Sequence, residues 1–169
     1  GLPFIYSAQS VFILKQIPES IAIPDIVFYI MMTILFVAYY CFDTVNAQKN
    51  SFRQLYNGTY FPRPWALPQF KYGILENPRY LRTKAGTPLL LDGWYRYARK
   101  WQYTTDVTIA TMWCFSCGFN LYFLPKFYMM FFVGMLFHRC LRDEEKCARK
   151  YGKDWEAYCS IVKYRFIPF

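Results

Sequence analysis

Long apolar runs alternate with charged stretches along the chain. Residues 26–42 and 107–124 contain no Lys, Arg, Asp or Glu. As a helix, the first run would rise about 25 Å, close to the roughly 30 Å hydrocarbon core of a bilayer. Two further apolar runs are present. One is the aromatic start of the chain at 1–14, and the other is expected to cover 127–141, after a turn at Pro125-Lys126. The pattern predicts an all-α fold, a polytopic membrane helix bundle.

Two polar regions separate and follow these runs. Residues 44–106 carry prolines that forbid a long helix, so a cytosolic loop region is expected there. Residues 142–169 are expected to form a cytosolic C-terminal region with an amphipathic helix that breaks at Gly152. Opposite charges four residues apart, such as Arg139 and Asp143, favour that helix. We treat 1–169 as a single C-terminal catalytic and cofactor-binding part.

The formal net charge is +9, and 18 of the 20 Lys and Arg residues lie in 44–106 and 139–165. The positive-inside rule predicts that both regions face the cytoplasm, which an even number of crossings satisfies. Because this rule already explains the surplus charge, membrane lipid is an expected partner and nucleic acid is not. The glycosylation sequon at Asn57 would then face the cytoplasm and remain unmodified.

The six cysteines do not have the spacing of a zinc finger or a disulfide framework. Cys114 and Cys117 form a CxxC pair, but this pair lies inside an apolar run, with no second pair and no neighbouring His. Packing therefore explains the pair better than redox chemistry or a metal, and no metal is expected.

Residues 89–106 and 138–159 are dense in basic and aromatic side chains. Guanidinium groups bind phosphates, and aromatic planes stack on flat rings, so these stretches suit a phosphorylated cofactor. Four residues at i+4 steps would share one helix face: Arg139, Asp143, Cys147 and Tyr151. The alternative is a solvated, salt-bridged helix on the membrane surface. No GxGxxG or GxxxxGK[ST] motif is present, so side chains would have to hold a nucleotide.

These two stretches, together with PFIYSAQ at 3–9 and YYCFDTVNAQKNSFR at 39–53, resemble the sterol reductase family. Members of that family reduce Δ14, Δ7 or Δ24(28) double bonds of sterols in sterol biosynthesis. The likeness covers nearly the whole chain except the insert at 54–75. It implies the C-terminal part of a longer, multi-pass oxidoreductase of the endoplasmic reticulum membrane, or of the cell membrane in a bacterium, with NADPH as cofactor and a sterol as substrate.

The resemblance also identifies candidate cofactor-binding residues. They are Lys49, Arg53, Leu90, Tyr95, Gln102, Tyr103, Asp106, Arg139, Asp143, Cys147 and Tyr151. Tyr95 stands where many members have Trp, and Gln102 where many have Asn. Arg99 and Lys100 match the family's A-R-K run and are added as phosphate contacts. The insert and the D-G-W-Y motif look most similar to the Δ24(28) branch, whereas the C-terminal motif is shared by the Δ7 and Δ14 branches.

The reaction that the resemblance implies is protonation of an alkene followed by hydride transfer to the carbocation. Tyr6, with Gln9 nearby, is a candidate catalytic residue in contact with the substrate, and no proton donor is assigned. Two alternatives stay open. One is an isoprenylcysteine-type, S-adenosylmethionine-dependent membrane methyltransferase, although RKWQY at 99–103 lacks that class's His-Pro. The other is a non-catalytic membrane anchor with a sterol reductase fold.

Overall fold

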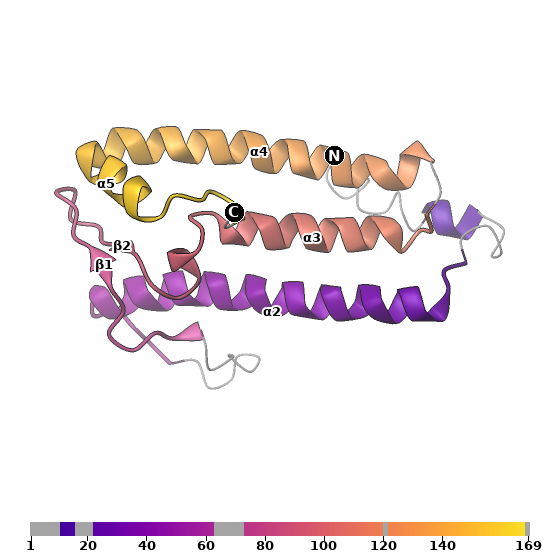
Figure 1. Cartoon of the computed structure of the whole chain (residues 1–169), viewed down its shortest axis with the longest axis horizontal. Helices are drawn as coiled ribbons and strands as arrows, with labels where there is room; N and C mark the ends of the chain where they lie inside the picture. Colours follow the sequence, from indigo (N-terminus) through magenta and orange to yellow (C-terminus); the bar gives the residue numbers. More distant parts are fainter. Residues whose placement is uncertain (1–10, 16–21, 63–72, 120–121, 168–169) are drawn as a thin grey trace. The chain divides into compact units, whose positions relative to one another are not determined.

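The computed structural model describes residues 11–15, 22–62, 73–119 and 122–167. The chain forms two compact units, which are described separately below. The first comprises Gly1–Tyr39 and Thr105–Arg139, and the second Tyr40–Thr104 and Cys140–Phe169. The described part is mainly helical, as the apolar pattern predicts (Figure 1).

Helix α2, Asp25–Tyr56, is longer than the apolar run that predicted it. It begins where the amides of Val27 and Phe28 donate to the carbonyl of Pro24, at 2.9 and 3.0 Å. It ends before Gly58, which has a φ of 66°. The prediction that residues 44–56 belong to a loop is therefore wrong. Among the described residues, α2 is the helix long and apolar enough to cross a membrane, with a mean hydropathy of 1.9 over its most apolar window.

Helix α3, Trp101–Phe115, and helix α4, Phe123–Tyr151, differ in their bounds from the predicted spans. Turns follow α3 from Ser116, so the expected continuous helix over 107–124 is wrong at its C-terminal end. The expected turn at Pro125-Lys126 is also wrong, because both residues lie in the first turn of α4. A proline is tolerated there, since a first-turn amide has no partner within the helix.

The first unit holds α3 from residue 105, together with the N-terminal parts of α2 and α4. Its surface carries exposed large apolar side chains, including Phe28, Phe36 and Phe131. Threonine hydroxyls in its helices bond back to the helix, as when Thr111 Oγ1 donates to the carbonyl of Val107 at 2.7 Å. Such a surface is apolar enough to face lipid or further apolar helices.

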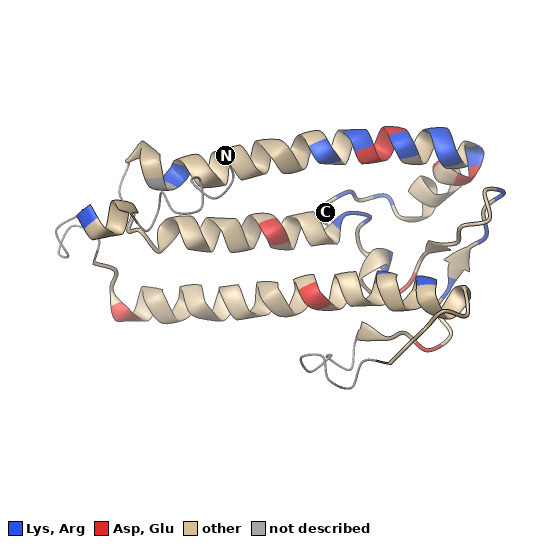
Figure 2. Cartoon of the chain, turned by 180° about the vertical axis from the view of Figure 1, so that it is seen from behind, with Lys and Arg blue, Asp and Glu red and all other residues tan. Residues whose placement is uncertain are grey.

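Charge is unevenly distributed along α4 (Figure 2). Its C-terminal part alternates basic and acidic residues and ends with Arg149 and Lys150 in the last turn. The helix stops at Tyr151, Gly152 has a φ of 53°, and helix α5 covers Lys153–Ile161. The predicted break at Gly152 is confirmed.

In the second unit, the turn at residues 92–96 packs on the polar face of α2. The 3-10 helix η3, Gly93–Arg96, begins as the Gly93 amide donates to Asp92 Oδ1 at 3.0 Å. The Trp94 amide donates to Gln48 Oε1 at 3.0 Å, and Trp94 Nε1 donates to Thr44 Oγ1 at 2.9 Å. Gln48 and Thr44 are completely buried. These polar side chains thus join η3 to α2.

A small apolar core and a hairpin complete the second unit. The core contains Val45 and Phe52 of α2 with Leu90 and Tyr95. Strands β1, Tyr80–Leu81, and β2, Leu89–Leu90, pair antiparallel with Tyr80 opposite Leu90 and Leu81 opposite Leu89. This two-stranded hairpin is an exception to the all-α prediction. Two hydrogen bonds tie its tip to the C-terminal helices: Lys84 amide to Asp154 Oδ2 at 2.8 Å, and Lys150 Nζ to Thr87 Oγ1 at 3.0 Å.

Gly93 is the position most sensitive to an added methyl group. Its φ is 62°, and a Cβ there would overlap with Gln48 Oε1. We expect Gly93→Ala to lower the free energy of unfolding by about 2–5 kcal/mol, through backbone strain and loss of the Trp94–Gln48 contact. Gly58→Ala is the matched control, because its φ is 66° but no atom lies within 4 Å of the added Cβ.

For Gly58→Ala we expect a loss of about 1–2 kcal/mol, which is the backbone strain alone. Thermal unfolding of the protein in detergent, with both variants measured side by side, checks the difference. If the two variants lost the same amount of stability, the close contact between residue 93 and Gln48 would make no contribution to the stability of the fold.

Candidate functional site

An open pocket of about 540 Å³ lies wholly within the second unit. Its walls come from α2, the β2 strand, the segment before α3, and the facing sides of α4 and α5. The residues that line it are Lys49, Phe52, Arg53, Pro88, Leu89, Leu90, Tyr95, Arg99, Lys100, Cys147, Tyr151, Trp155 and Tyr158.

Basic side chains enter the pocket from two directions. Lys49 and Arg53 are one helical turn apart on α2, beyond the apolar run that ends at Phe42, and Arg99 and Lys100 precede α3. Burial lowers the pKa of Lys49, and the neighbouring charges of Arg53 and Lys100 lower it further. An anion bound among these cations would relieve their mutual repulsion, so the geometry favours a negatively charged ligand.

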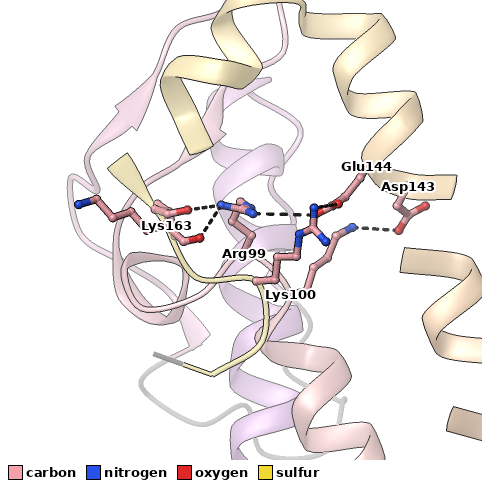
Figure 3. Close-up of polar contacts among 7 residues, drawn as sticks. Arg99, Lys100, Asp143, Glu144 and Lys163 are labelled. Carbon is pink, nitrogen blue, oxygen red and sulfur yellow. Dashed lines mark hydrogen bonds and ion pairs between the residues drawn. The ribbon is translucent and has the colours of Figure 1, made fainter. Parts of the chain in front are cut away.

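Two carboxylates of α4 hold the basic residues that precede α3 (Figure 3). Asp143 Oδ2 accepts from Lys100 Nζ at 3.1 Å and from the Tyr103 hydroxyl at 2.9 Å. Glu144 Oε1 lies 3.9 Å from Arg99 Nη2, and both of these side chains are largely buried. Asp143 therefore fixes the direction of the Lys100 side chain at the edge of the pocket.

Aromatic side chains of α4 and α5 also line the pocket. Tyr151 and Trp155 have nearly parallel rings with centroids 6.5 Å apart, and Trp155 and Tyr158 are stacked at 5.4 Å. Burial raises the pKa of both Tyr95 and Tyr158, so their phenols stay neutral at physiological pH. Tyr95 is only 4% exposed as a residue, and its hydroxyl has no hydrogen-bond partner within the described part of the chain. A buried hydroxyl that lines a pocket without a protein partner is suited to bind a polar ligand atom.

The pocket gathers part of the set of residues predicted to bind a cofactor. Those that line it are Lys49, Arg53, Leu90, Tyr95, Cys147 and Tyr151, with the added Arg99 and Lys100.

The other predicted residues do not line the pocket. The hydroxyl of Tyr103 donates a hydrogen bond to Asp143, and Gln102 is a partly buried residue of α3. Asp106 and Arg139 belong to the other compact unit, where they interact electrostatically. The candidate catalytic residue Tyr6, like Gln9, is outside the described residues.

Sequence reasoning missed several residues that line the pocket. They are Phe52, Pro88, Leu89, Trp155 and Tyr158. Trp155 and Tyr158 lie on α5, beyond the break at Gly152, so the i+4 spacing along α4 could not be extended to them. Pro88 and Leu89 reach the pocket through the hairpin, which no periodicity in this short segment indicates.

Comparison with known proteins identifies the family. The whole chain, residues 1–169, matches the Ergosterol biosynthesis ERG4/ERG24 family. The chain therefore belongs to this sterol reductase family, which confirms the resemblance found in its motifs.

Relatives of different named specificity are about equally similar to the chain. A "Delta(14)-sterol reductase erg24" of Schizosaccharomyces pombe is 36% identical over 168 residues, which are 99% of this chain and 35% of the relative. A "Delta(24(24(1)))-sterol reductase erg4A" of Aspergillus fumigatus has the same identity and coverage. A "7-dehydrocholesterol reductase" of Xenopus laevis is 32% identical over 99% of this chain and 34% of the relative. The chain thus spans about a third of the length of these relatives.

The two tyrosine hydroxyls near the basic residues should contribute differently to stability. Tyr103→Phe removes a hydrogen bond to the Asp143 carboxylate, so we expect the free energy of unfolding to fall by about 1–2 kcal/mol. Tyr95→Phe removes a hydroxyl without a partner in the described structure, so we expect a change within about 0.5 kcal/mol. Thermal unfolding without ligand measures both, and a larger loss for Tyr95→Phe would mean that its hydroxyl is already engaged.

Proposed function

We propose that this chain is the cofactor-binding part of a membrane sterol reductase that uses NADPH to reduce a carbon–carbon double bond of a sterol. The observation that carries the proposal is the pocket of the second unit, which four basic residues and several aromatic residues line together. Membership of a family whose relatives are named sterol reductases supports the reaction class.

The residues of the pocket fit NADPH by their chemistry. Lys49, Arg53 and Lys100 supply positive charge for phosphates, and the Tyr95 hydroxyl offers an unused polar group. Tyr151 and Trp155 offer ring faces on which a base or nicotinamide can stack. A pocket held by side chains also agrees with the lack of a glycine-rich phosphate loop in the sequence.

When bound, NADPH supplies a hydride. The residues of this chain would bind NADPH, orient it and shield it from water. Lys49 and Arg53 would hold the phosphates, and bound phosphate would restore the protonated form of Lys49 that burial disfavours. Phe52, Leu89 and Leu90 present apolar surface that excludes water from this side of the pocket.

A sterol is the proposed substrate, with the side-chain Δ24(28) bond favoured on the D-G-W-Y motif and the Δ14 and Δ7 bonds as the other choices. Equal identity to the Δ14 and Δ24(24(1)) relatives does not separate these choices. We further propose that the apolar helices form part of a multi-pass bundle in the endoplasmic reticulum membrane. This proposal is supported by the length and hydropathy of α2 and the exposed apolar surface of the first unit.

The pocket chemistry argues against a methyltransferase. S-adenosylmethionine carries a cationic sulfonium and no phosphate, so basic residues entering from α2 and from the segment before α3 would repel it rather than bind it. The family match gives that alternative no support either. A non-catalytic membrane anchor would keep the fold without using the pocket.

Measurements of ligand binding by the whole protein in detergent distinguish the reductase, the methyltransferase and the non-catalytic anchor. We expect NADPH to bind at least about 10-fold more tightly than NADH, because the added phosphate meets further cations, and S-adenosylmethionine to bind negligibly. Isothermal titration with the three ligands measures this order. Preferential binding of S-adenosylmethionine would overturn the reductase proposal, and no binding of any of them would favour the anchor.

Single substitutions locate the phosphates. We expect Lys49→Ala and Arg53→Ala each to raise the Kd for NADPH by about 10-fold or more, because each removes a cation from the pocket. Arg149→Ala is the matched control, since this side chain is 81% exposed and pairs with Glu145 outside the pocket. If all three variants bound NADPH equally well, the phosphates would lie elsewhere.

A further inference from the structure

The segment that follows α5 is attached along the start of α3. Residues 162–166, which we name the C-terminal strap, accept hydrogen bonds from backbone and side-chain donors of residues 99–104. The Arg99 amide donates to the carbonyl of Tyr164 at 3.0 Å, and the Lys100 amide donates to the carbonyl of Arg165 at 2.8 Å. Thr104 Oγ1 donates to the carbonyl of Phe166 at 2.9 Å. The backbone of Arg99 and Lys100, two basic residues of the pocket, is thus hydrogen-bonded to the strap.

The guanidinium of Arg99 is also held by the strap (Figure 3). Its Nη1 donates to the carbonyl oxygens of Val162 and Lys163. Because this nitrogen is engaged by the protein, Arg99 is a weaker candidate for a phosphate contact than the sequence alone predicted. Its main task in this geometry is to join the strap to the pocket wall.

Glu144, a residue of α4, forms ion pairs with Arg99 and with Arg165 of the strap. Its Oε2 lies 2.8 Å from Arg165 Nη2 on the strap, and its Oε1 lies 3.9 Å from Arg99 Nη2. The carboxylate is only 15% exposed, so water screens these contacts weakly. Removing the carboxylate charge would leave two guanidinium groups close together without their common counter-ion.

We propose that Glu144 is a positioning residue. By pairing with Arg99 and Arg165, it holds the C-terminal strap on residues 99–104 and so fixes where Arg99 and Lys100 stand in the pocket wall. The part of this inference that concerns ligand affinity rests on the proposed binding of NADPH. The part that concerns the strap does not.

Two variants and a matched control test the inference in the whole protein in detergent. Glu144→Gln removes the charge from α4, and Arg165→Gln removes the partner from the strap, at a side chain that is 53% exposed. The control is Glu145→Gln, at the adjacent residue, whose side chain is 70% exposed and pairs only loosely with Arg149 at 3.9 Å. Hydrogen exchange of the backbone at residues 99–104 reports on the strap without any ligand.

We expect exchange at residues 99–104 to become at least about 10-fold faster in Glu144→Gln and Arg165→Gln and to stay unchanged in Glu145→Gln. The KM for NADPH should rise about 5-fold or more in the first two variants, with kcat changed less than 2-fold, because the groups displaced bind rather than react. Glu144→Asp, which keeps the charge, should recover part of the lost affinity.

Unchanged exchange in both Glu144→Gln and Arg165→Gln would overturn the inference. Faster exchange with an unchanged KM would show that the strap does not position the pocket cations, which also overturns it. If the unmodified protein failed to bind NADPH, the proposed function would fail, while the exchange measurement would still decide whether Glu144 holds the strap.

Discussion

The second unit depends on the recognition of Trp94 by two buried polar side chains of α2. Gln48 and Thr44 have no exposed surface, so each must find a hydrogen-bond partner inside the protein, and both find one in Trp94. This pairing fixes η3 against α2 at one register. Tyr95 follows directly, and Arg99 and Lys100 come a few residues later, so the position of three pocket residues is set by contacts that lie outside the pocket.

The same unit places several basic side chains close together, and their mutual repulsion opposes folding. Lys49, Arg53, Arg99 and Lys100 share one pocket, and the pKa of Lys49 is lowered mainly by burial and further by the charges of Arg53 and Lys100. Asp143 and Glu144, adjacent on α4, form ion pairs with the two cations that precede α3. Asp143 also favours the charged form of Lys49, but within the described residues neither Lys49 nor Arg53 forms an ion pair of its own, so a phosphate would contribute most beside these two cations of α2.

The sequence predicted those elements that have a clear signal in their residue types, such as an apolar run or a glycine at a break. Apolar runs located α2, α3 and α4, and Gly152 located the break before α5. The extension of α2 to Tyr56 was missed because its buried positions include Thr44 and Gln48, which hydropathy counts as surface residues. The pocket cations were found through family motifs. The C-terminal strap could not be found in this way, because it acts largely through backbone carbonyls, to which side-chain identity gives no clue.

The pocket is complete within one compact unit, although the chain spans only about a third of the relatives it matches. Alkene reduction has a further requirement, because an isolated double bond accepts hydride only after a proton has been added at the other carbon. Neither Asp106 nor Arg139 lies in the unit that holds the pocket. Asp106 and Arg139 are therefore not among the residues that line this pocket, and their part in binding a cofactor stays a prediction from the family motifs.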